Sequence, residues 1–156
     1  MNEALLQRLA TLEGESAVRR LMARYMDLCD VPRAPVEARD LAQLFTEDAI
    51  WEGLGTQTAQ TFGQHRGREA IAAFVAGYLP PSDHFQLNLH YLTSESIVVD
   101  GEGAQGQWIM QQISTYADGR NELFGTRLNI DFRCVDGTWQ IAHFRTQRLL
   151  NLELRP

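Results

Sequence analysis

Residues 83–101 read DHFQLNLHYLTSESIVVDG, and this stretch decides how the rest of the chain is interpreted. It places His90 in an apolar, strand-like context and ends in the turn signal Asp100-Gly101. An imidazole titrates near neutral pH, so it is the commonest general base in enzymes, and one neighbouring carboxylate can tune it. A single histidine is more often a structural residue, so the catalytic interpretation needs a partner from elsewhere in the chain.

Predicted strands fill the sequence after this stretch. Turn signals occur at residues 100–103, at Asp118-Gly119-Arg120 and at Asp136-Gly137. They separate three further predicted strands, at residues 105–117, 122–135 and 138–150. This spacing predicts long antiparallel hairpins.

The alternation of side chains predicts which residues share a face of the sheet. Residues 127–134 alternate between an apolar face (Leu128, Ile130, Phe132 and Cys134) and a polar face (Arg127, Asn129, Asp131 and Arg133). In the last strand, strict alternation places Trp139, Ile141, His143 and Arg145 on one side, with Ala142 and Phe144 opposite.

The N-terminal segment has helical spacing. Apolar residues recur every three or four positions from Leu5 to Cys29, and Gly14 predicts a break between a short arm and a main helix. The main helix should end near Asp30, because Pro32 disfavours helical angles at the residue before it. A carboxylate at a helix C-terminus lies at the negative end of the helix dipole, so Asp30 needs a cationic or hydrogen-donating partner.

Shorter elements are predicted between the main helix and the strands. They are a helix from Pro35 through Phe45, a strand at residues 49–53, a loop or hairpin at 53–60, a weak strand at 61–65 and a helix at 67–78. Helices thus come first and long strands follow, which is typical of an α+β fold. We expect one domain over residues 1–156, a cone-shaped α+β barrel with about three N-terminal helices on a curved, mostly antiparallel sheet. The interior of such a cone is suited to an apolar pocket with a few polar groups.

Composition excludes several functional classes. The net charge is −6 and the fourteen basic residues, all Arg, are scattered, which argues against nucleic acid and anionic membranes as partners and favours an uncharged or weakly polar ligand. The absence of lysine excludes Schiff-base chemistry and a P-loop. No apolar run is long enough to span a bilayer and no secretion signal is present, so we expect a cytoplasmic location. Cys29 and Cys134 lack metal or redox spacing.

The order of several loose motifs resembles the SnoaL-like family of the nuclear transport factor 2-like superfamily. The resemblance covers nearly the whole chain. It rests on Tyr25 followed five residues later by Asp30, LFTEDAIW at residues 44–51, GREAI at 67–71, His90 ten residues before Asp100, and DGTWQIAH at 136–143. It implies the cone fold, which hosts dehydratases, isomerases and cyclases as well as noncatalytic subunits and binding modules.

The resemblance also implies a catalytic pair. The pattern is most similar to scytalone dehydratase, bile-acid 7α-dehydratase and hexachlorocyclohexane dehydrochlorinase, for which the resemblance implies a dyad of an aspartate at the end of the first helix and a histidine on the central strand. These positions match Asp30 and His90. A carboxylate that accepts a hydrogen bond from one imidazole nitrogen would leave the other as a general base facing the cavity.

Further candidates surround this pair. Tyr25 could donate a hydrogen bond to a substrate oxygen, or it could be a core aromatic residue. The candidate substrate-binding residues are Trp51, Phe85, His84, Trp108, Asn129 and Arg145. Arg145 is the first candidate for an arginine that points into the cavity, and Arg127 and Arg148 are the next candidates. Each could instead fill the core or lie on a solvated face. No metal-binding spacing or nucleophile motif occurs.

We therefore expect a cofactor-independent lyase of the dehydratase type, or an isomerase, that acts on a small hydrophobic cyclic substrate through an Asp-His dyad without metal. The alternative is a noncatalytic member that binds a ligand or a partner subunit. Long antiparallel strands with a partly apolar outer face also predict a homo-oligomer, and relatives imply a trimer or a dimer.

Overall fold

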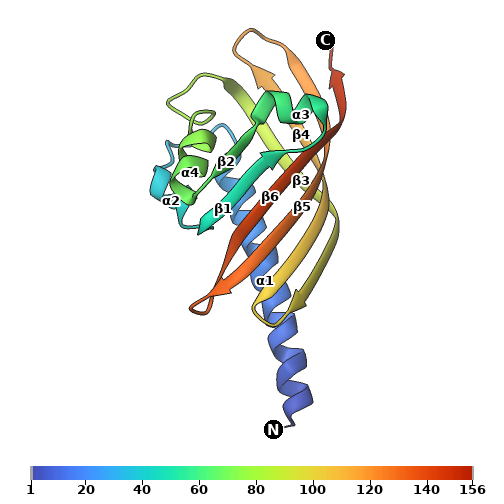
Figure 1. Cartoon of the computed structure of the whole chain (residues 1–156). Coiled ribbons are helices and arrows are strands. Elements are labelled where there is room, and N and C mark those ends of the chain that lie inside the picture. The colour runs from blue at the N-terminus through green and yellow to red at the C-terminus, as the bar shows by residue number, and fades with distance from the viewer. Residues whose placement is uncertain (1, 156) are drawn as a thin grey trace.

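The computed structural model describes residues 2–155. Figure 1 shows the helices and strands, coloured from the N-terminus to the C-terminus. The elements are α1 (Glu3–Cys29), α2 (Ala38–Ala42), β1 (Phe45–Gly53), α3 (Thr56–Phe62), β2 (Gln64–Arg66), α4 (Arg68–Ala76), β3 (Phe85–Asp100), β4 (Gly103–Tyr116), β5 (Asn121–Val135) and β6 (Thr138–Glu153).

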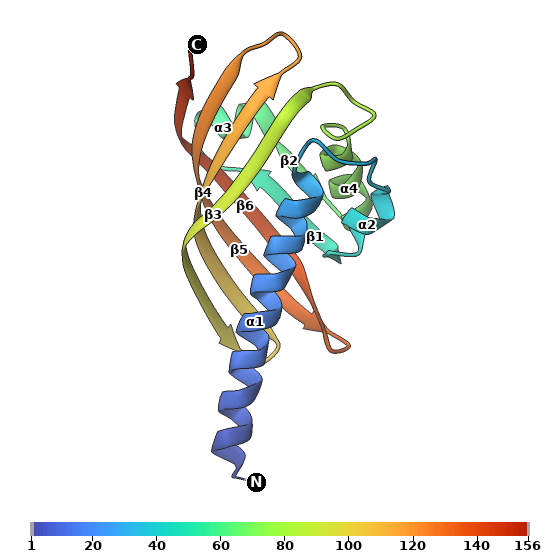
Figure 2. The ribbon, with the colours of Figure 1, turned by 180° about the vertical axis from the view of Figure 1, so that it is seen from behind.

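Within residues 2–155 the strands form one sheet in the order β2-β1-β6-β5-β4-β3, antiparallel except where β1 pairs with β6. The sheet curls, and α1 lies across its concave side with its first turns extending beyond the strands (Figure 2). The predicted α+β architecture and the four long C-terminal strands are confirmed. None of the helices in the described part of the chain has the length and apolar character that a bilayer-crossing helix requires.

The predicted break at Gly14 is wrong, because α1 runs through it without interruption. Gly14 is buried where the helix meets the sheet, and a Cβ atom there would lie 3.0 Å from Val99 Cγ1 and 3.3 Å from Trp139 Cζ2. The glycine therefore serves close packing of α1 on β3 and β6, a use that a sequence pattern cannot separate from helix termination.

Two predictions between α1 and α4 are also wrong. The second helix is limited to α2, and β1 begins already at Phe45, which is fully buried and pairs with Ile141. The segment predicted as a loop contains α3, which brings a fourth helix against the sheet. Gly55, with φ +76°, starts this helix and Gly63, with φ +64°, ends it, so the glycines bound a helix.

An extra residue in β6 overturns the predicted facing of the last strand. The pairing of β5 with β6 shifts between Asp131 with His143 and Phe132 with Ile141, so that Ala142 is additional. Ile141 and Phe144 are consequently both in the core, whereas strict alternation placed them on opposite faces. His143 and Arg145 lie on the outer face. A second shift, between Gly125 and Thr126, leaves Leu149 as another extra residue.

Candidate active site

Asp30 and His90 lie within hydrogen-bonding distance. Asp30 Oδ1 accepts the backbone N–H of His90 at 3.0 Å and lies 2.8 Å from His90 Nδ1. The His90 side chain is 10% exposed and that of Asp30 is 33% exposed. When Nδ1 carries the proton and donates it to Asp30, Nε2 of the neutral imidazole is left as an acceptor.

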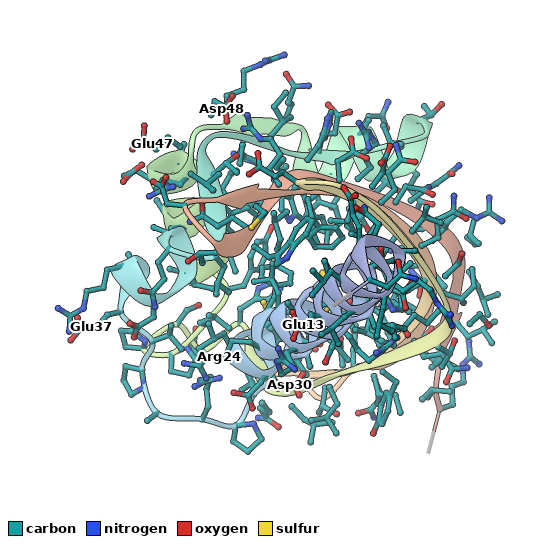
Figure 3. All side chains as sticks on the ribbon, turned by 90° about the horizontal axis from the view of Figure 1, so that it is seen from below. Glu13, Arg24, Asp30, Glu37, Glu47 and Asp48 are labelled. Atoms are coloured by element: carbon teal, nitrogen blue, oxygen red, sulfur yellow. The ribbon has the colours of Figure 1, made fainter. Side chains whose placement is uncertain are left out.

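The end of α1 explains why these two residues meet. Asp30 is the C-terminal cap of the helix, and the next residue, Val31, forms a β-bridge with Asn88 through two backbone hydrogen bonds of 2.9 Å. The bridge holds the chain against β3 two residues before His90. Figure 3 shows Asp30 where α1 meets the sheet, whereas Glu37 and Asp48 point away from the body of the molecule.

His90 lines a cavity of about 130 Å³ between the concave side of the sheet and the helices. Seven of the nineteen residues that line the cavity are aromatic. Apart from Tyr25, these are Trp51, Phe62, Phe74, Tyr78, Phe85 and Phe144. Trp51 stacks on Phe144 with 5.4 Å between ring centroids and 5° between planes. The wall is therefore suited to a flat apolar ligand.

Tyr25 lines the same cavity and is buried. Trp51 Nε1 donates to its hydroxyl oxygen at 3.1 Å, so the hydroxyl proton is left to donate elsewhere. Burial raises the pKa of Tyr25 well above its ordinary value of 10.0. Burial likewise raises the pKa of the Cys29 thiol, a further lining residue, to about 12. Both groups are thus neutral donors at physiological pH.

A polar strip on β3 and β4 continues the wall beside His90. Asn88 and Gln112 line the cavity, and Gln112 Nε2 donates to Asn88 Oδ1 at 2.9 Å. Ser114, which is fully buried, donates to the same oxygen at 2.8 Å. Sequence reasoning did not single out Asn88 or Gln112. The sequence could have predicted Asn88 as a cavity residue, because it is two residues before His90 and strand alternation puts both on the same face.

The structure brings Tyr25, Trp51 and Phe85 to the cavity with His90, but not the other predicted binding residues. Trp108 is buried in the core, edge-on to Phe132, with Gly106 leaving room for its ring. Asn129 pairs with Arg145 on the outer face, and the bulge in β6 is what turns Arg145 outward.

Two predicted residues have other environments. Arg145 Nη2 donates to Asp131 Oδ2 at 2.8 Å and is 2.8 Å from His143 Nδ1. His84 is exposed just before β3 and packs edge-on against Tyr78 and Tyr116 at the rim. The arginine that does line the cavity is Arg148. Among residues 2–155, no group of three or more His, Cys, Asp or Glu side chains is arranged to hold a metal ion.

Comparisons with known proteins agree with this architecture. The family model of the SnoaL-like domain matches residues 10–145. An NTF2-like protein with a cystatin-like fold from Novosphingobium aromaticivorans is 25% identical, with a TM-score of 0.72 over 93% of this chain and 88% of that one. No curated protein matches the sequence significantly.

Two further solved structures share the fold at lower identity. The hexachlorocyclohexane dehydrochlorinase LinA-type3 from Novosphingobium barchaimii LL02 is 18% identical, with a TM-score of 0.75 over 96% of this chain and 93% of that one. A scytalone dehydratase-like protein from N. aromaticivorans DSM 12444 is 18% identical, with a TM-score of 0.76 over 93% of this chain and 90% of that one. The match of the family model over most of the sequence shows that the chain belongs to the SnoaL-like domain family.

Proposed function

We propose that the protein is a cofactor-independent lyase of the dehydratase type, or an isomerase, in which Asp30 and His90 form a general acid-base dyad. The observation that carries the proposal is the 2.8 Å contact between Asp30 Oδ1 and His90 Nδ1 at the wall of an apolar cavity. Asp30 fixes the imidazole tautomer, and Nε2 acts on the ligand.

The proton balance of such a reaction needs no other group. His90 Nε2 takes a proton from a carbon made acidic by an adjacent carbonyl or leaving group, and the electron pair forms the new double bond. In a dehydration, the resulting imidazolium protonates the departing hydroxyl as water. In an isomerisation, it returns the proton to another carbon. A positioned general base of this kind contributes about 10² to 10⁴-fold to the rate.

The cavity favours a small cyclic substrate. An apolar cavity of about 150 Å³ binds benzene in another protein, and the present volume of about 130 Å³ accommodates one ring. The oxygen of Tyr25 already accepts the Trp51 hydrogen bond, so the hydroxyl proton, which is otherwise directed to the Cys29 thiol, is the one that Tyr25 would donate to a substrate oxygen. The two neighbours described as a dehydrochlorinase and a scytalone dehydratase-like protein support an elimination.

The test is turnover of a panel of cyclic hydroxyketones and hydroxylated cyclohexenones, followed by absorbance of the conjugated product. We expect His90→Asn and Asp30→Asn to lower turnover by about 10² to 10⁴-fold. Asp27→Asn and His84→Asn are matched controls, because Asp27 is exposed one helical turn before Asp30 and His84 lies outside the cavity wall. Both should retain wild-type turnover.

Unchanged turnover in His90→Asn would refute the dyad. Tight binding of panel members without elimination or isomerisation would instead support the noncatalytic alternative, in which the same cavity only holds a ligand. We also propose, as a separate expectation, that the chain forms a homodimer or homotrimer, which sedimentation velocity would establish.

A further inference from the structure

Arg148 is a cation in a cavity that is otherwise lined by neutral side chains, His90 apart. It lies on β6 after the Ala142 bulge, which turns Phe144, Thr146 and Arg148 to the concave side. Its side chain is half-buried and lies against two aromatic rings: the guanidinium carbon is 4.1 Å from the centroid of Phe124 and 5.7 Å from that of Phe62.

The Arg148 guanidinium has no carboxylate within ion-pair distance among residues 2–155. Burial lowers the pKa of Arg148, and Tyr116 and then Glu122 act in the opposite direction. The oxygens of Glu122 are themselves engaged elsewhere. Tyr116 donates to Glu122 Oε2 at 2.6 Å, and Arg120 Nη1 lies 4.0 Å from Glu122 Oε1. Arg145, three residues before Arg148 and on the outer face, is by contrast paired with Asp131.

An unpaired cation at an apolar wall is an unusual arrangement. Removing a charge from water is costly unless a counter-charge or hydrogen bonds replace the hydration. The two aromatic faces supply part of this through cation–π contact, but they accept no hydrogen bond from the half-buried guanidinium, whose N–H donors therefore remain available to water or to a ligand. A planar oxyanion offers the acceptors that this fork of donors matches.

The sheet register locates this cation relative to His90. His90 pairs with Gln112 on β4, which pairs with Phe124 on β5. The ring below the guanidinium is therefore two strands away from the proposed base, about 10 Å between backbones. A ligand with an anionic group at Arg148 would place a ring or unsaturated chain along the aromatic wall and a carbon near His90 Nε2.

We propose that Arg148 binds a carboxylate of the substrate, so that the substrate class is a small cyclic acid whose reacting carbon lies at the end opposite the carboxylate. This inference rests on the proposed function, because it names the substrate class of the same site. It also changes the expectation from composition: a net charge of −6 suggested an uncharged ligand, but one local cation decides what the cavity holds.

The experiment compares trans-cinnamate with its neutral isostere trans-cinnamamide, using isothermal titration calorimetry. Both have one ring, and they differ in the charge of the terminal group. We expect the wild-type protein to bind cinnamate at least about tenfold more tightly than cinnamamide. Arg148→Gln should remove this preference by weakening cinnamate alone, and Arg148→Lys should restore part of it because the charge returns without the planar fork.

Arg127→Gln is the matched control, since Arg127 is an exposed arginine on the outer face of the neighbouring strand. It should leave both affinities unchanged. Thermal unfolding of each variant checks that the fold is retained. Equal binding of the two probes by the wild type, no binding of cinnamate at millimolar concentration, or equal weakening of both probes in Arg148→Gln would overturn the proposal.

His90→Asn separates this proposal from the proposed function. The variant should lose turnover yet keep the preference for cinnamate, because the base does not hold the carboxylate. If His90→Asn loses the preference and Arg148→Gln keeps it, His90 is the anion-binding group and the assignment to Arg148 is wrong. If the preference depends on Arg148 but His90 variants keep full turnover, the dyad fails and the carboxylate site stands.

Discussion

Val31 and Asn88 exchange two backbone hydrogen bonds of 2.9 Å, and this bridge fixes where α1 ends relative to β3. One residue before the bridge is Asp30, and two residues after it on β3 is His90. The main chain alone therefore sets the approach of the carboxylate to the imidazole, before any side-chain rotamer is chosen. The catalytic proposal thus depends on a helix terminus being tied to the edge of the sheet.

The first prediction concerns the tautomer of His90. Asp30 Oδ1 lies 2.8 Å from Nδ1, so the neutral ring should carry its proton on Nδ1. In Asp30→Asn the amide can also donate, so that preference should be lost and a mixture of tautomers should appear. Nitrogen-15 correlation spectra of the imidazole at pH 8 measure this. Asp27→Asn should leave the His90 signals unchanged, and a wild-type ring protonated on Nε2 would contradict the assignment.

The second prediction concerns the bond from Trp51 to Tyr25. Tyr25→Phe keeps the ring packing but leaves the buried indole N–H without its acceptor. We expect a loss of about 1–3 kcal/mol in the free energy of unfolding, measured with urea. The double variant Tyr25→Phe with Trp51→Phe should recover part of that loss, because neither polar group then remains. Additive losses in the double-mutant cycle would show that the bond contributes nothing.

The third prediction tests the close approach at Gly14. Gly14→Ala gains about 1 kcal/mol of helix propensity but brings a methyl group to 3.0 Å from Val99, so the two effects should nearly cancel. Gly14→Leu cannot be accommodated and should destabilise the fold by about 1–3 kcal/mol. Glu13→Leu, on the exposed side of the same helix, is the control. Equal unfolding midpoints for Gly14→Leu and Glu13→Leu would show that the contact is not tight.

The fourth prediction concerns acid sensitivity. The hydrogen bond from Gln64, followed by His143, lowers the pKa of Glu52 below its ordinary value of 4.5. A carboxyl group with a depressed folded-state pKa stabilises the protein above its unfolded pKa, and this stability is lost as the pH falls through the folded value. The urea midpoint should therefore fall less between pH 6 and pH 3 in Glu52→Gln than in wild type. Glu47→Gln should keep the full wild-type decrease.

Sequence reasoning succeeded where the determining interactions are local. The strands β3 to β6 are bounded by Asp-Gly turn signals, and turn chemistry acts over a few residues. Asp30 was recognisable because a carboxylate at a helix end before a proline has few local partners. The contact with His90, sixty residues away in sequence, was expected from the family resemblance and from that missing partner.

Sequence reasoning failed where a segment distant in the sequence determines the local structure. Gly14 appears as a helix breaker until the approach of Val99 and Trp139 is known. The facing of β6 depends on its register with β5, and a bulge changes that register without any mark in composition. This error placed Arg145 in the cavity in place of Arg148, although both were candidates.

The bulge at Ala142 also implies an uneven tolerance to changes in chain length. A chain shortened by Ala142 alone would alternate regularly and would still turn Ile141, Phe144 and Arg148 inward. Related chains can therefore gain or lose this residue and keep the same cavity chemistry. One residue added or removed between Phe144 and Arg148 would instead carry the guanidinium to the opposite face. Within one strand, a position that tolerates insertion or deletion, as a loop does, therefore lies beside a segment whose length cannot change without moving Arg148 out of the cavity.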